Sequence, residues 1–151
     1  MSTDKKDFFI AGIGASAGGL DAIQQLFDNI PNNTGMAFVV VQHLSPDFKS
    51  LMPELLAKHT TMSIFTAEDN QIIQQNCIYL NKEDKNLTVE EGKLHLVDRG
   101  SKNKLNLPIN EFFDSLGGEY KEKSIGIVLS GTGSDGSKGI KTIKEAGGCL
   151  S

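Results

Sequence analysis

The chain has 151 residues, of which 38% are hydrophobic and 23% are charged, and its formal net charge at pH 7 is -4. This length fits one domain, and the composition is that of an ordinary globular protein, which excludes global disorder and fibrous architectures. The apolar runs are far shorter than the roughly 20 residues that cross a bilayer, and the first charged residues precede no signal-like apolar segment. We therefore expect no membrane insertion, and an acidic chain without a basic cluster also argues against nucleic-acid binding.

The cysteines give a first indication of the cellular compartment. Cys77 and Cys149 are the two cysteines of the chain, and they lie far apart in a pattern that matches no metal-ligand spacing. We interpret them as two reduced thiols, which favours a cytoplasmic location.

The apolar pattern predicts an α/β fold. Short continuous apolar runs are typical of strands buried on both faces of a parallel sheet, and they cover residues 8–13, 37–41 and 125–129. Helical spacing of apolar residues, or helix-forming composition, marks residues 20–27, 51–59, 109–116 and 139–146. This alternation predicts a doubly wound, mostly parallel sheet flanked by helices in a Rossmann-like three-layer arrangement.

One segment departs from this alternation. Residues 77–97 contain three short β-like stretches, and Glu91-Gly92 has the character of a hairpin turn between the last two. We expect a small β-hairpin excursion from the main sheet here. The polar stretch 99–106 that follows is interpreted as a surface loop.

The predicted strand ends carry unusual residues. The first strand runs into a glycine-rich turn over residues 12–19, the second ends in Gln42-His43, and the strand over 125–129 runs into a second glycine-rich turn over 130–136. Ligands of open α/β sheets bind beyond the carboxyl ends of the strands. These three turns therefore predict the place of a functional site.

A dinucleotide site is one alternative. Gly131, Gly133 and Gly136 match the spacing of that fingerprint, after a strand and before a helix. However, the match lies late in the chain, and the second strand ends in Gln42-His43 where an acidic residue for the ribose is expected. We regard this as the weaker hypothesis and expect no nucleotide cofactor.

Hydrolysis by an activated serine is the stronger hypothesis. Residues 14–18 form a G-x-S-x-G turn, which lifts the hydroxyl of Ser16 above the sheet near the positive end of the next helix. A serine needs a neighbouring base, and His43 at the end of the next strand can serve. Asp135, in the third turn, can orient the imidazole and stabilise its charged form.

Each of these residues also has a structural interpretation. Ser16 could cap the first helix, His43 could be a hydrogen-bonded turn residue, and Asp135 could cap the last helix. Their convergence on one edge of the sheet favours catalysis. Their chain order, Ser–His–Asp, differs from the Ser–Asp–His order of α/β-hydrolases. His59 and His95 are expected to lie away from this site as surface or structural residues.

At these motifs the sequence resembles a known family. Residues 13–19, 41–46, 78–80 and 129–136 are similar to the catalytic domain of the bacterial chemotaxis receptor methylesterases, the CheB-type protein-glutamate methylesterases. The resemblance implies hydrolysis of glutamate γ-methyl esters on the cytoplasmic helices of chemoreceptors, with release of methanol, and deamidation of certain glutamines. Such a reaction needs no metal and no cofactor, and the sequence shows no metal-ligand cluster.

The resemblance also assigns roles to residues. It makes Ser16 the nucleophile, His43 the general base and acid, and Asp135 the residue that orients His43. Backbone N–H groups of Ala17 and Thr132 would stabilise the oxyanion. Ala17 stands where the best-known members have threonine, and Thr132 where they usually have methionine.

The particular motif variants most resemble the methylesterase portion of large fused signalling proteins, which also contain a receptor methyltransferase. We therefore expect a methylated receptor and a fused methyltransferase module as partners. Residues 149–151 resemble the start of a further strand, so we expect residues 1–151 to be a methylesterase domain truncated at its C-terminal end. A non-catalytic signalling or partner-binding module of the same fold is the alternative.

Overall fold

The computed structural model describes residues 8–16, 19–43, 51–99, 106–129 and 135–150. The elements in chain order are β1 (Ile10–Ala15), α1 (Leu20–Asp28), β2 (Ala37–Gln42), α2 (Met52–Leu56), β3 (Ser63–Thr66), β4 (Gln71–Ile72), β5 (Cys77–Leu80), β6 (Lys85–Glu90), β7 (Lys93–Asp98), α3 (Pro108–Tyr120), the 3₁₀ turn η1 (Lys121–Lys123), β8 (Ser124–Val128), α4 (Ser137–Glu145) and β9 (Cys149–Leu150).

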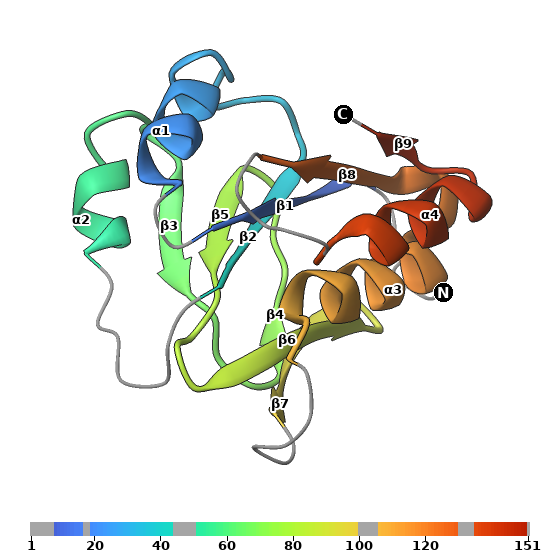
Figure 1. Cartoon of the computed structure of the whole chain (residues 1–151). Coiled ribbons are helices and arrows are strands. Elements are labelled where there is room, and N and C mark those ends of the chain that lie inside the picture. The colour runs from blue at the N-terminus through green and yellow to red at the C-terminus, as the bar shows by residue number, and fades with distance from the viewer. Residues whose placement is uncertain (1–7, 17–18, 44–50, 100–105, 130–134, 151) are drawn as a thin grey trace.

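The main sheet has six strands in the order β3-β5-β2-β1-β8-β9, and every neighbouring pair is parallel. After β1 the chain forms β2, then the edge strand β3, and then β5 between these two, all on one side of β1; it later adds β8 and β9 on the other side. The strand order therefore reverses beside β1, which is where open α/β sheets bind their ligands. This arrangement confirms the predicted doubly wound α/β fold (Figure 1).

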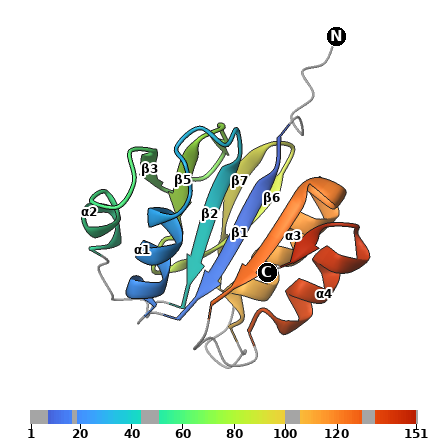
Figure 2. The same cartoon turned by 90° about the horizontal axis from the view of Figure 1, so that it is seen from above.

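Helices cover both faces of the sheet. Helices α1 and α2 lie on one side and α3 and α4 on the other, as Figure 2 shows. Side chains alternate between the two faces of a strand, and the two cores follow this alternation. Ile13 of β1 packs in the cluster with Ile23 and Phe27 of α1, whereas Ile10 belongs to the cluster of Phe112 and Phe113 of α3. The molecule therefore has three layers.

Glycines in β1 allow α3 to lie directly against the sheet. A Cβ atom on Gly12 would lie 2.8 Å from the ring of Phe113, and one on Gly14 would lie 2.6 Å from Ile109. Both contacts are too short for real carbon atoms, so only glycine permits this approach. The close fit brings the N-terminus of α3 beside the carboxyl end of β1.

The segment around residues 77–97 differs in part from the prediction. β6 and β7 form the predicted hairpin, with Glu91 and Gly92 at positive φ angles of 55° and 77° in the turn. β5, however, belongs to the main sheet, where it pairs in parallel with both β2 and β3. All residues of β5 are buried, as expected for a central parallel strand. β3 and β4 were not predicted from the sequence.

The C-terminal part of the described chain follows the prediction. α4 ends in a Schellman motif, because Gly147 has a φ of 93° and the N–H of Gly148 donates to the carbonyl of Ile143 at 2.8 Å. The chain then enters β9, which pairs with β8. Within the described residues, the helices are all too short or too polar to cross a bilayer.

Candidate active site

The ends of β1 and β2 bring Ser16 and His43 together. Ala15 is the register partner of Gln42, so the next residue of each strand, Ser16 and His43, leaves the sheet side by side. The backbone N–H of His43 donates to the carbonyl of Ala15 at 3.2 Å. Ser16 and His43 are both partly exposed to solvent. The predicted nucleophile and base thus share one edge of the sheet.

Asp135 reaches His43 from the other side of the switch point. Its Oδ2 lies 2.6 Å from Nε2 of His43, and the side chain of Asp135 is only 1% exposed, against 37% for His43. Nε2 is itself buried and makes no hydrogen bond of acceptable direction. The contact is therefore a close approach of the imidazole edge to the carboxylate, not a straight N–H···O bond. Nε2 is thus the ring nitrogen that faces Asp135.

The carboxylate of Asp135 is held by the N-terminus of α3. The N–H of Ile109 donates to Oδ2 at 3.0 Å, and the N–H of Asn110 donates to Oδ1 at 2.8 Å. Free N–H groups and the helix dipole both favour a negative charge at this end of a helix. The structural alternative of the sequence analysis is therefore wrong in detail, because Asp135 caps α3 and not the following helix.

The turn that contains Ser16 is fixed through its backbone. The carbonyl of Ser16 accepts a hydrogen bond from the N–H of Gly19 at 3.0 Å and another from Nε2 of Gln42 at 3.1 Å. Gln42 is 4% exposed, and its own backbone N–H and carbonyl are both bonded to the side chain of Asn81, at 3.0 and 2.9 Å. A relay from β5 through β2 thus holds the turn after β1.

The hydroxyl of Ser16 has no structural task among the described residues. The residue before α1 is Gly19, and no side chain caps that helix, so the interpretation of Ser16 as its cap is wrong. Within the same part of the chain, the hydroxyl makes no hydrogen bond to the ring of His43. Such bonds are often long in unliganded enzymes and tighten when substrate binds. Ala17 and Thr132, the predicted oxyanion donors, lie outside the described residues.

A match to a family model shows to which protein family the chain belongs. The family model described as CheB methylesterase matches residues 11–151. The chain belongs to the CheB methylesterase family. The motif resemblance stated above is thereby confirmed.

Relatives of known name extend over most of this CheB-family chain. A protein-glutamate methylesterase/protein-glutamine glutaminase of Saccharophagus degradans is 31% identical over 151 residues, which cover 97% of the chain and 43% of the relative. A putative enzyme of the same name from Leptospira interrogans is 31% identical over 137 residues, 90% of the chain and 71% of the relative. The chain thus spans less than half the length of the first of these relatives.

A solved structure agrees with the fold. The crystal structure of the Thermotoga maritima CheB methylesterase catalytic domain superposes with a TM-score of 0.84 at 29% identity, over 95% of the chain and 78% of that domain.

The hydrogen bonds that two polar side chains of the site make were not predicted from the sequence. Gln42 was noted only as the end of a strand, although a polar residue that closes a run of buried apolar ones is itself a sign of a specific hydrogen bond. Asn110 falls in the predicted helix over 109–116 and was given no role of its own. It lies directly beside Asp135, and the residue is 7% exposed.

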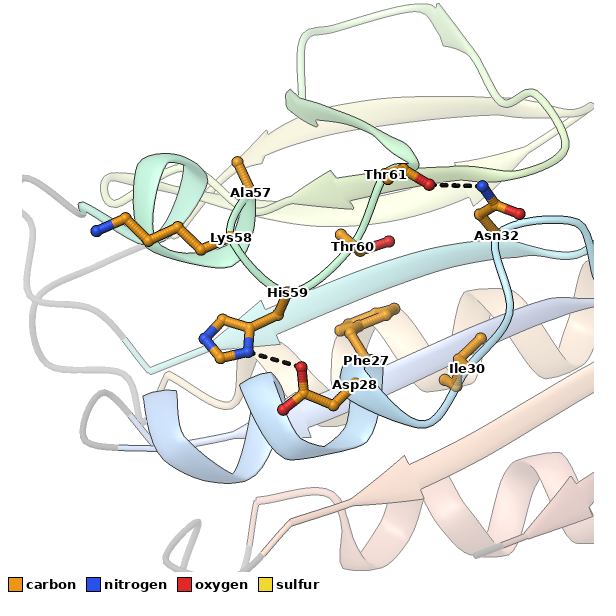
Figure 3. A pocket seen from close by; sticks show the side chains of 9 residues that line it. All are labelled: Phe27, Asp28, Ile30, Asn32, Ala57, Lys58, His59, Thr60 and Thr61. Carbon is orange, nitrogen blue, oxygen red and sulfur yellow. Dashed lines mark hydrogen bonds and ion pairs between the residues drawn. The ribbon is translucent and has the colours of Figure 1, made fainter.

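A small hollow accompanies the site, and a larger one lies elsewhere. The small hollow, about 60 Å³, is lined in part by Gln42, Leu80 and Asn81 at the carboxyl edge of the sheet. The larger hollow, about 360 Å³, is lined by the end of α1, the end of α2 and the residues that precede β2 and β3 (Figure 3). Because those residues enter their strands, this hollow lies at the opposite, amino edge.

The other two histidines lie away from the site, as expected. His59 lines the larger hollow, where its Nδ1 bonds Oδ1 of Asp28 at 2.7 Å (Figure 3). His95 is in β7, and its Nδ1 is 3.8 Å from Oδ1 of Asp69. In the described part of the chain, no cluster of three or more histidine, cysteine or acidic side chains could hold a metal ion.

Proposed function

We propose that this CheB-family domain hydrolyses γ-methyl esters of glutamate side chains in a protein, with Ser16 as nucleophile, His43 as general base and acid, and Asp135 as the residue that orients His43. The contact between His43 and the buried carboxylate of Asp135, at 2.6 Å, carries the proposal. The names of the relatives support the same reaction.

The first half of the reaction forms an acyl-enzyme. Nδ1 of His43 takes the proton of the Ser16 hydroxyl as Oγ attacks the ester carbonyl, and Asp135 stabilises the resulting imidazolium through Nε2. The tetrahedral intermediate collapses, His43 returns the proton to the methoxy oxygen, and methanol leaves. The acyl group is then an ester of Ser16. Because the side chain of His43 is partly exposed, its ring can turn as substrate binds and straighten both contacts.

The second half restores the enzyme. His43 takes a proton from a water molecule, the hydroxide attacks the glutamyl-serine ester, and the proton returns to Oγ of Ser16. The net change is ester plus water to carboxylic acid plus methanol. A glutamine side chain would follow the same path with ammonia as the leaving group, and the word glutaminase in the relatives' names supports this second reaction.

The developing oxyanion needs hydrogen-bond donors. We assign this role to the backbone N–H groups of Ala17 and Thr132, as the family resemblance implies. Ser16 also precedes α1 by a short turn, so the positive end of that helix faces the reacting centre. A lost oxyanion donor typically lowers kcat by roughly 10²–10³.

The proposed partner is a methylated chemoreceptor or a related signalling protein with glutamyl methyl esters on its cytoplasmic helices. A fused methyltransferase module and a cytoplasmic location belong to the same proposal.

Methanol release from a methylated receptor fragment tests the function directly. The wild-type chain should release methanol, whereas Ser16→Ala should not. A fluorophosphonate that reacts with activated serines should label the wild type and Ser63→Ala, whose altered serine is exposed on β3, but not Ser16→Ala. An unlabelled wild type at pH 7–8 would instead support a non-catalytic module.

A further inference from the structure

The first turns of α3 and α4 are joined by one side chain. Oδ1 of Asn110 accepts the N–H of Gly136 at 2.9 Å and the N–H of Gly139 at 2.7 Å. Gly136 precedes α4 and has no side chain with which to cap it. The free N–H groups at the start of α4 therefore depend on an amide from another helix.

Asp135 and Asn110 cap each other's helices. Asp135, which precedes α4, accepts two N–H groups at the start of α3, and Asn110, in the first turn of α3, accepts two N–H groups at the start of α4. The result is a closed ring of hydrogen bonds. Within it, the carboxylate of Asp135 is fixed by the backbone of Asn110, and the backbone next to Asp135 is fixed by the side chain of Asn110.

The conformation of Gly136 makes this second attachment necessary. Gly136 has a φ of 100°, a region that only glycine enters freely, so the chain directly after Asp135 has no intrinsic preference for the observed turn. The bond from Gly136 N–H to Asn110 selects that turn. Both Asn110 and Asp135 are almost completely buried, so water cannot easily replace either partner.

We propose that Asn110 is a positioning residue, which holds Asp135 at the distance and angle from which it orients His43. This inference rests on the proposed function, and it adds a residue to which neither the family resemblance nor the comparisons give a role. Asn110 does not touch His43 or the reacting atoms. It acts by fixing the backbone of the residue after Asp135.

The test compares four forms of the chain: the wild type, Asn110→Ala, Asn110→Asp and Thr142→Val. Asn110→Ala removes the acceptor. Asn110→Asp keeps an acceptor oxygen in the same place, and a carboxylate is well suited to the positive end of α4. Thr142→Val is the matched control, because Oγ1 of Thr142 also links the two helices, by a 2.6 Å bond to Oδ1 of Asp114, but farther along both of them.

The rate at which a fluorophosphonate labels Ser16 is the main readout. We expect Asn110→Ala to lower it by roughly 10–100-fold, since a displacement of about 1 Å in a catalytic group costs about 10² in rate. Asn110→Asp should recover most of that loss, and Thr142→Val should stay near the wild type although its thermal stability falls. With a methylated receptor fragment, kcat should fall in Asn110→Ala while KM changes little. The ¹⁵N shifts of the His43 ring should change in Asn110→Ala and not in Thr142→Val.

Three results would overturn the inference. These are wild-type labelling in Asn110→Ala, an equal loss of rate in Asn110→Ala and Thr142→Val at matched stability, and ring shifts of His43 that do not distinguish the two. If Asn110→Ala does not fold, Asn110→Gln, which keeps the amide but moves its oxygen by one methylene, must slow labelling instead. An inert wild type would refute the proposed function alone, because the ring shifts still report whether Asn110 positions Asp135.

Discussion

The molecule contains two histidine–aspartate pairs that are nearly equal in length and opposite in setting. His43 lies 2.6 Å from Asp135, and His59 lies 2.7 Å from Asp28. The side chain of Asp135 is 1% exposed, whereas that of Asp28 is 48% exposed. The exposed pair makes a well-directed hydrogen bond, and the buried pair does not.

The two carboxylates also sit at opposite ends of their helices. Asp135 receives two N–H groups from the start of α3, where the helix dipole favours an anion. Asp28 is the last residue of α1, where the dipole opposes an anion, and about half of its side chain is exposed to solvent. The distance between histidine and aspartate therefore does not by itself distinguish the two pairs. What distinguishes them is that the carboxylate of Asp135 is buried at a helix N-terminus and that a serine lies at the same edge of the sheet.

The largest expected effect comes from replacing the two aspartates in turn. Asp135→Asn should lower the rate of fluorophosphonate labelling by about 10⁴, because the neutral amide cannot stabilise the imidazolium or hold the same tautomer of His43. Asp28→Asn should leave the rate unchanged. Stopped labelling reactions resolved by mass spectrometry measure both. If the rate of labelling fell equally in the two variants, the contrast between the two histidine–aspartate pairs would be wrong.

A second prediction concerns a substitution that disturbs the setting of His43 and Asp135 while leaving both residues unchanged. A Cβ atom on Gly139 would lie 2.5 Å from Cβ of Phe113 and 3.2 Å from Cα of Asn110, so Gly139→Ala must push α4 away from α3. We expect a loss of about 1–3 kcal/mol in the free energy of unfolding, together with slower labelling of Ser16. Denaturant titration measures the first quantity.

The matched control for Gly139 is another glycine of the same helix pair. Gly118 is in α3, and a Cβ atom there would meet nothing within 4 Å. Gly118→Ala should therefore stabilise the protein, by up to about 1 kcal/mol, because alanine loses less backbone entropy in a helix. A stabilising Gly139→Ala would contradict the tight packing on which Asp135 depends.

The third prediction concerns the other side of the site. Gln42→Met removes the bond from Nε2 to the carbonyl of Ser16 and should slow labelling about tenfold, since the bond from Gly19 remains to hold the turn. Gln75→Met is the control, because Gln75 makes the same kind of bond, at 3.0 Å, to the carbonyl of Gly35 in an exposed loop. Equal labelling rates in the two variants would show that the relay from β5 does not position the nucleophile.

These residues also indicate what sequence can and cannot predict here. Ser16, His43 and Asp135 follow strand ends that periodicity locates, and parallel strands bring their carboxyl ends to one edge, so the placement of these three residues at one edge could be predicted. The hydrogen bond between Asn110 and Gly136 could not be predicted, because these residues are 26 apart in the sequence and meet only through the packing of α3 on α4. β5 was assigned to the hairpin and not to the main sheet, because a short buried run has no hydrophobic period that distinguishes these two sheets.

A smaller effect, on the pH dependence of stability, is expected from the buried phenol of Tyr79. Burial raises the pKa of Tyr79 from 10.0 to about 12, although the N–H of Gln74 donates to its oxygen and opposes the shift. The folded state therefore favours the neutral phenol. This contribution to stability is complete below pH 10 and is lost as the pH rises toward 12. Tyr79→Phe should lack this alkaline loss, which we expect to be on the order of 1 kcal/mol, as measured by denaturant titration at a series of pH values. Parallel stability curves for the two proteins above pH 10 would contradict it.

The smallest effect should come from the exposed pair itself. His59→Ala removes the bond to Asp28, but both side chains are partly exposed, and exposed pairs contribute about 0–1 kcal/mol. A double-mutant cycle with Asp28→Ala isolates this coupling from the loss of each side chain. The coupling should be small and should weaken further in salt, because exposed charges are screened.

The labelling rate of Ser16 should be the same in all four members of the cycle, since the hollow of His59 lies at the edge of the sheet opposite to Ser16. A change in that rate would mean that the two edges are coupled, and the exposed pair could then no longer serve as the inert counterpart of His43 and Asp135.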